Sequence, residues 1–157
     1  MYIAQGEASF RRIVVPEETH VPSTTRHEER IARFMRFPAR PKILLLEPYY
    51  PPAARWGSFK VEQGYLPPLG LISIYRWLKE HGHDVTFIDT QFGDITREVL
   101  EQRLSEGQFD LVGLPLFTPT ATYVFDTAKI VRDVLPNAVV VFGGVHATSR
   151  SAETLEE

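Results

Sequence analysis

The 157-residue sequence contains no cysteine, and this absence removes a class of chemistry. Without a thiol, the chain cannot form a disulfide, hold an iron–sulfur cluster or use a cysteine nucleophile. No apolar run approaches the roughly 18–20 residues that a membrane span needs. The N-terminus also lacks the basic start and apolar block of a secretory signal. We therefore expect no membrane span and a cytoplasmic location.

Familiar cofactor and nucleophile motifs are missing as well. The sequence has no GxGxxG after its first apolar run, no GxxxxGK[ST] phosphate loop and no GxSxG elbow. Glu47 is followed by Pro48, so the acidic pair of a phosphoreceiver is missing too. His81, His83 and Asp84 form a small group at the end of an expected helix. We interpret its histidines as solvated groups that compensate the helix dipole, not as metal ligands.

Charge is unevenly distributed along the chain. The net charge is −3, yet residues 1–41 carry seven Arg against five Glu, and the remainder carries ten basic against fifteen acidic residues. Phosphate binding relies on clustered Lys and Arg, so the acidic main body disfavours a nucleic-acid partner.

The chain divides into an extension, residues 1–41, and a domain, residues 42–157. The extension contains the linker-like stretch VVPEETHVPSTT and the segment HEERIARFMRF. That segment predicts one short amphipathic helix with Ile31, Phe34 and Met35 on one side. We expect this helix to pack on the domain as a tail, with docking to a partner as the alternative.

Apolar runs and helical patterns alternate four times in the domain. The runs KILLLE, DVTFID, DLVGLPL and NAVVVFGG predict strands, and helices are expected over PPLGLISIYRWLKEHGH, DITREVLEQRLSEG and TATYVFDTAKIVRDVLP. The final SRSAETLEE predicts the start of a fourth helix. This alternation predicts an α/β fold with a doubly wound parallel sheet, Rossmann-like and flavodoxin-like.

The helical patterns also predict buried stripes and helix ends. The expected stripes are Leu71, Ile74, Tyr75 and Leu78 in the first helix, and Val124, Ala128, Val131 and Leu135 in the third. The expected boundary residues are Gly82 as a C-terminal cap, Asp94 as an N-cap, Gly107 just beyond the second helix, Thr120 as an N-cap and Pro136 as a stop.

Ligands of such sheets bind at the carboxyl ends of the strands, where the loops 47–66, 89–94, 115–120 and 143–150 meet. The first loop is long and aromatic, with Tyr49, Tyr50, Trp56, Phe59 and Tyr65. It either covers the sheet end or walls a flat ligand, and we favour the wall.

The other three loops carry smaller groups. Asp89 can belong to a site or cap the next helix, and Thr118 and Thr120 offer hydroxyls. In VVVFGGVHATSR, Gly143 and Gly144 allow positive φ and close approach to a ligand, although a tight turn explains them equally well.

Taken in order, these pieces resemble one family. KILLLEPYYPP, PPLGLISIYRWLKEHGHDVTFID, FDLVGLPLFTPT and PNAVVVFGGVHAT are similar to the N-terminal cobalamin-binding domain of cobalamin-dependent radical S-adenosylmethionine proteins. The resemblance covers about residues 41–155. It implies cobalamin over the carboxyl edge of the sheet, with its nucleotide tail against the glycine turn. The implied cofactor-binding residues are Tyr49, Leu69, Gly70, Asp89, Thr90, Gln91, Phe117, Thr118, Thr120, Gly143, Gly144, His146 and Ala147.

Two departures from related cobalamin domains matter. Gln91 stands where a DxHxxG motif has its cobalt-binding histidine, so we expect no histidine ligand from the 89–94 loop, and His146 is expected beside the tail. The iron–sulfur cluster and S-adenosylmethionine of the family need cysteines that this chain lacks. They are expected in a missing radical domain, in cis or in trans, and a fifth strand is expected beyond Glu157.

The leading hypothesis is thus a cobalamin-binding module that serves a radical enzyme domain and is not catalytic alone. Two alternatives stay open. One is a truncated Rossmann-like scaffold or interaction domain without cofactor. The other is a flavin- or nucleotide-binding flavodoxin-like domain, which is disfavoured because the first loop is not rich in Ser, Thr and Gly.

Overall fold

A computed structural model describes residues 38–50, 67–92 and 95–156. Its elements in chain order are β1 (Ile43–Leu46), α3 (Leu69–Glu80), β2 (Val85–Ile88), α4 (Arg97–Gly107), β3 (Leu111–Pro115), a 3₁₀ turn (Thr118–Thr120), α5 (Ala121–Val134), β4 (Val139–Gly143), α6 (Val145–Ser149) and α7 (Ser151–Glu156). The expected HEERIARFMRF helix and the aromatic residues Trp56, Phe59 and Tyr65 lie outside the described ranges.

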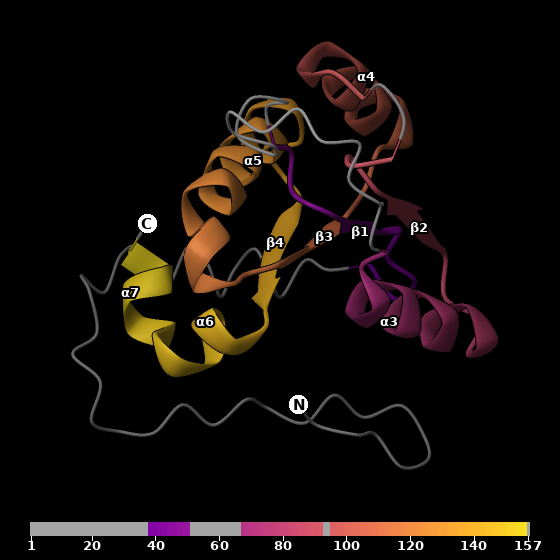
Figure 1. Cartoon of the computed structure of the whole chain (residues 1–157). Helices are drawn as coiled ribbons and strands as arrows, with labels where there is room; N and C mark the ends of the chain where they lie inside the picture. Colours follow the sequence, from indigo (N-terminus) through magenta and orange to yellow (C-terminus); the bar gives the residue numbers. More distant parts are fainter. Residues whose placement is uncertain (1–37, 51–66, 93–94, 157) are drawn as a thin grey trace.

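The four strands form one parallel sheet with the order β2-β1-β3-β4, which confirms the doubly wound fold (Figure 1). Strand β1 pairs with β2 from Ile43 opposite Val85, and with β3 from Ile43 opposite Leu111. The order reverses direction between β1 and β3. In sheets of this kind that reversal marks the ligand-binding crevice, at the carboxyl ends of the strands.

Helices cover the two faces of the sheet unequally (Figure 1). Helix α3 packs on one face, where Ile43 and Leu45 of β1 join Leu71 and Val85 in a small buried cluster. Helices α4 and α5 cover the other face, and the alternate residue Leu44 belongs to the larger cluster there. Side chains alternate along a strand, so β1 is buried on both faces, as its unbroken apolar run predicts.

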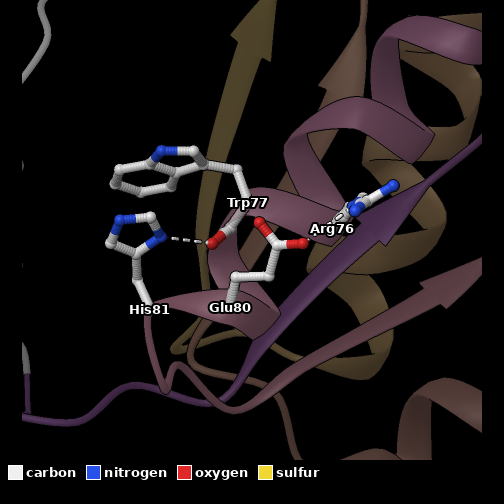
Figure 2. Close-up of polar contacts among 4 residues, drawn as sticks. All are labelled: Arg76, Trp77, Glu80 and His81. Carbon is white, nitrogen blue, oxygen red and sulfur yellow. Dashed lines mark hydrogen bonds and ion pairs between the residues drawn. The ribbon is translucent and has the colours of Figure 1, made fainter.

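Helix α3 ends as its sequence predicts. Gly82 adopts φ +77°, its N–H donates to the Lys79 carbonyl, and the His83 N–H donates to the Leu78 carbonyl. This pair of bonds is the Schellman motif. Figure 2 shows the last turn, where His81 donates from Nδ1 to the Trp77 carbonyl oxygen at 2.7 Å and Arg76 pairs with Glu80 at 2.8 Å.

Several local predictions were wrong. Helix α4 begins at Arg97, and Thr96, not Asp94, caps it by accepting the Val99 N–H. Gly107 is the last residue of α4, and Gln108 behind it adopts the left-handed conformation. A Cβ at Gly107 would collide with the Phe109 ring, so close packing explains this glycine, not a helix stop.

Two further predictions need correction. Ile74 does not belong to the buried stripe of α3, because it is 51% exposed. The stretch 143–150 is not a loop, since α6 begins at Val145 directly after Gly144 and is followed by α7. The stripe of α5 is confirmed, and it also buries Thr127 and Ile130.

Candidate functional site at the carboxyl edge

The carboxyl edge of the sheet gathers the predicted site residues from every loop. Tyr49 follows β1, and Leu69 and Gly70 open α3. The second loop carries Asp89, Thr90 and Gln91, and the third carries Phe117, Thr118 and Thr120. Beyond β4 lie Gly143, Gly144, His146 and Ala147. Parallel strands bring all of these segments to one end of the sheet, as predicted.

The loops after β3 and β4 are joined by backbone hydrogen bonds. The Leu116 N–H donates to the Gly143 carbonyl at 2.6 Å, and the His146 N–H donates to the Leu116 carbonyl at 3.3 Å. Gly144 makes this contact possible with φ +107°, a conformation that other residues rarely adopt. A Cβ on Gly144 would also stand 2.9 Å from the Leu116 carbonyl oxygen. The second glycine is therefore required by the fold.

Gly143 has a different role. Nothing in the described chain lies within 4 Å of a Cβ built on it, and its backbone is exposed. The space above this residue is thus open to a ligand. Packing within the described chain does not require a glycine here. Sequence reasoning treated the two glycines alike, and only the structure separates them.

Thr118 and His146 form a polar pair across the same two loops. Their Oγ1 and Nδ1 atoms lie 2.9 Å apart and are hydrogen-bonded. Thr120 does not cap α5 with its side chain, and its hydroxyl instead donates to the Phe117 carbonyl at 3.2 Å. The Thr118–His146 pair is uncharged when the histidine is neutral, so it offers hydrogen bonds without a fixed charge.

The loops after β1 and β2 are joined in a similar way. Thr90 is buried and donates its hydroxyl to the Pro48 carbonyl at 2.7 Å. Asp89 accepts the Gln91 backbone N–H at 2.8 Å, a turn of the Asx type, and so does not cap α4. The Gln91 side chain donates from Nε2 to Glu47 Oε1 at 2.9 Å. Thr90 therefore acts as a structural tie within the predicted site.

Glu47 is a functional candidate that the sequence reasoning missed. It is only 8% exposed at the end of β1. Burial and the nearby Asp89 charge raise the pKa of its carboxyl to about 7, although the hydrogen bond from Gln91 lowers it. The sequence contains a signal for it, because Glu47 directly follows the apolar run of β1 and so lies at the carboxyl end of a strand.

Large apolar side chains are exposed at this edge. They are Leu69 at the start of α3, Phe92 after β2, Phe117 after β3 and Val145 at the start of α6, with 67%, 68%, 48% and 65% exposure. Phe92 and Val145 were not predicted as site residues. Exposed apolar groups that converge on a binding edge are typical of sites for ligands with apolar surface.

Within residues 38–50, 67–92 and 95–156, no three His, Asp or Glu side chains are grouped to hold a metal ion. No helix of those same ranges is long and apolar enough to cross a membrane.

Comparisons with known proteins show the family of this chain. The B12 binding domain family matches residues 60–157. An anaerobic magnesium-protoporphyrin IX monomethyl ester cyclase of Synechocystis is 37% identical over 109 residues, covering 68% of this chain and 21% of that protein. An uncharacterized methyltransferase of Pyrococcus horikoshii is 32% identical over 91 residues, or 58% of this chain and 20% of that protein.

A solved structure shares the fold. The cobalamin-dependent S-adenosylmethionine radical enzyme OxsB, with aqua-cobalamin bound, superposes with a TM-score of 0.54 at 15% identity. The match covers 90% of this chain and 19% of that one. The chain thus spans about a fifth of the relatives that it matches.

Proposed function

Because the chain belongs to the family of B12 binding domains, we propose that its carboxyl edge binds cobalamin for use by a radical S-adenosylmethionine domain. The observation that carries this proposal is the set of exposed apolar side chains that follow the ends of the four strands: Leu69, Phe92, Phe117 and Val145. These side chains lie beside uncharged hydrogen-bonding groups. A corrin is a broad, flat ring bordered by amides, and it matches such an edge in both respects.

The residues present fit the group. No described atom lies within 4 Å of a Cβ built on Gly143, so a nucleotide tail can approach the backbone closely there. Thr118 and His146 offer hydrogen bonds to its phosphate and amides. The bond to Thr118 fixes the His146 ring, so we assign His146 a place beside the tail. Gln91 is held by Glu47, and no histidine ligand comes from the described part of its loop.

The proposal extends to the reaction of the whole protein. When bound, cobalamin supplies a cobalt-centred carrier of methyl groups or electrons. The relatives include a protein named as a cyclase and one named as a methyltransferase, which supports ring formation or methyl transfer as the reaction class. We assign residues 42–157 to the cobalamin unit and the radical reaction to a separate domain, in cis or in trans. That domain must hold the iron–sulfur cluster, since this chain has no cysteine.

Titration with hydroxocobalamin tests the binding proposal. We expect corrin absorbance to remain with the protein after desalting, at one equivalent per chain. Flavin mononucleotide, the cofactor of the flavodoxin-like alternative, should not be retained. Loss of all corrin absorbance on desalting, or retention of flavin alone, would overturn the proposal.

A substitution at Gly143 tests the location of the site. Gly143→Leu places a side chain in the open space, and we expect the affinity to fall by roughly tenfold or more, which corresponds to about 1.4 kcal/mol. The melting temperature should stay close to that of the wild type, because no described atom crowds this position. The matched control is Ser105→Leu, which places the same leucine side chain on an exposed position near the far end of α4. Equal affinities for the two variants would contradict the assigned site.

A further inference from the structure

Glu47 and Gln91 form a buried polar contact that the proposed function does not explain. The Glu47 backbone N–H donates to the Ile88 carbonyl at 2.9 Å, which fixes the residue where β1 and β2 end. Its carboxyl is then left with little water and accepts Gln91 Nε2 at 2.9 Å. An acid at 8% exposure is rare unless it is paired with a positive charge. Here its recorded partner is a neutral amide.

The groups around Glu47 make its proton exchangeable near neutrality. Asp89, from the end of β2, adds a negative charge, and together with burial it raises the pKa of the Glu47 carboxyl to about 7. The strand on the other side, β3, carries no titratable residue between Leu111 and Thr118. On α5, Asp126 and Lys129 pair with each other at 3.4 Å, and both are exposed. His146, beyond β4, is hydrogen-bonded to Thr118.

The two protonation states of Glu47 suit opposite ends of an amide. An ionised carboxylate only accepts hydrogen bonds, so it binds the Gln91 Nε2 donor. A protonated carboxyl has an O–H to donate, and it can bind the Gln91 oxygen instead. The backbone beneath does not need to move, because Asp89 Oδ1 holds the Gln91 N–H at 2.8 Å and Thr90 is tied to Pro48. The proposed change is a turn of the Gln91 side-chain amide.

We propose that Glu47 is a proton-responsive positioning residue that sets which end of the Gln91 carboxamide faces the bound corrinoid. This inference rests on the proposed function. A ligand laid over this edge removes the remaining water from Glu47 and brings its own apolar surface close. Desolvation favours the neutral acid, so binding takes up a proton at Glu47, and the neutral form binds more tightly.

The expected result is an affinity that depends on pH. Cyanocobalamin is the probe, because its axial ligand does not titrate in this range. For the wild-type chain we expect binding to weaken by about three- to tenfold between pH 6 and pH 8.5, the size of one hydrogen bond. Glu47→Gln has no proton to exchange at this position, so it should lose the part of the pH dependence that comes from Glu47.

Two other variants separate positioning from a merely structural role. Gln91→Leu removes the hydrogen bond that lowers the pKa of Glu47, so the midpoint of the pH profile should move upward. Glu106→Gln is the matched control, because Gln102 Nε2 donates to Glu106 Oε1 at 2.8 Å in the same type of pair on the exposed surface of α4. It should keep the wild-type profile.

The possible outcomes are distinct. A wild-type profile that is flat, or one that Glu47→Gln leaves unchanged, would overturn this inference while the binding proposal stands. A midpoint that Gln91→Leu does not move would also overturn it. Absence of cyanocobalamin and hydroxocobalamin binding at every pH would instead overturn the proposed function itself.

Discussion

The two ends of the sheet are built from different kinds of contact. At the amino end, the contacts end helices or join the starts of neighbouring strands: Gly82 ends α3, Gln108 ends α4, and Asp110 accepts the Lys42 N–H at 2.7 Å from 68 positions away. At the carboxyl end, hydrogen bonds join loops that are far apart in the sequence, as in Glu47–Gln91 and Thr118–His146. The amino end is explained by folding alone. The carboxyl end aligns side chains from four loop regions, as a binding site requires.

The largest expected effect comes from placing the same substitution at a glycine of each end. Gly144→Ala forces a Cβ to within 2.9 Å of the Leu116 carbonyl oxygen at φ +107°. We expect it to lower the free energy of unfolding by about 2–4 kcal/mol. The Cβ of Gly82→Ala meets no atom within 4 Å. This variant should lower the free energy of unfolding by only about 1 kcal/mol, because alanine disfavours the left-handed conformation. Urea denaturation measures both values, and equal losses would show that the Leu116 contact does not constrain the turn.

Local patterns in the sequence were sufficient to predict the end of α3, the buried stripe of α5 and the class of sheet. The Gly82 cap follows from a glycine at the end of an apolar stripe, and the α5 stripe follows from three- and four-residue spacing. The parallel sheet follows from alternating strands and helices. Each of these features depends on neighbours in the sequence or on the order of elements, which a single chain reveals.

The predictions failed where a distant partner decides the structure. Gly107 is the exception, because it was expected just beyond α4 and the Phe109 ring that packs on it lies only two positions away. The start of α6 at Val145 was missed, because the turn before it is held by Leu116, which follows β3. Gln91 was predicted as a site residue without its partner Glu47, which lies 44 positions away. The assignment of individual site residues to cobalamin stays a prediction.

The second effect concerns the pH dependence of stability at the carboxyl end. Glu47 has its ordinary pKa of 4.5 in the unfolded chain and a pKa of about 7 in the folded one. The folded state therefore holds this proton more tightly, and stability declines as pH rises from about 4.5 through 7. The loss reaches at most about 3 kcal/mol.

Urea denaturation between pH 5 and pH 8.5 measures this decline. Comparison with Glu47→Gln removes the contribution of every other titrating group, and the difference between the two profiles belongs to Glu47. Glu106→Gln should follow the wild type, since its side chain belongs to an exposed pair on α4. Parallel profiles for wild type and Glu47→Gln would show that the carboxyl is solvated in the folded protein.

The third effect tests whether a substitution at the amino end changes the affinity for the ligand. Asp110→Ala removes the acceptor of the Lys42 N–H, which joins the starts of β1 and β3. We expect a loss of about 1–2 kcal/mol in the free energy of unfolding. The affinity for hydroxocobalamin should stay within about twofold of the wild type. The two sites are far apart, so the binding free energy should change by less than about 0.5 kcal/mol. A larger change in affinity would mean that the two ends are coupled.

The smallest effect on stability comes from one histidine at each end. At the amino end, His81 stacks on Trp77 with 3.9 Å between ring centroids and is exposed (Figure 2). At the carboxyl end, His146 is held by Thr118. Each histidine side chain makes a hydrogen bond near the surface. Each change to Ala should therefore lower the free energy of unfolding by less than about 1 kcal/mol. Stability alone therefore cannot separate the two residues.

Binding does separate them. His146→Ala removes a hydrogen-bonding group from the edge that we assign to the nucleotide tail, and the affinity for hydroxocobalamin should fall by about three- to tenfold. His81→Ala should leave that affinity unchanged, while the fluorescence of Trp77 changes because its stacking partner is lost. Equal affinities for the two variants would remove His146 from the site. A weaker affinity for His81→Ala would indicate that the ligand also contacts the amino end of the sheet, contrary to the proposed site.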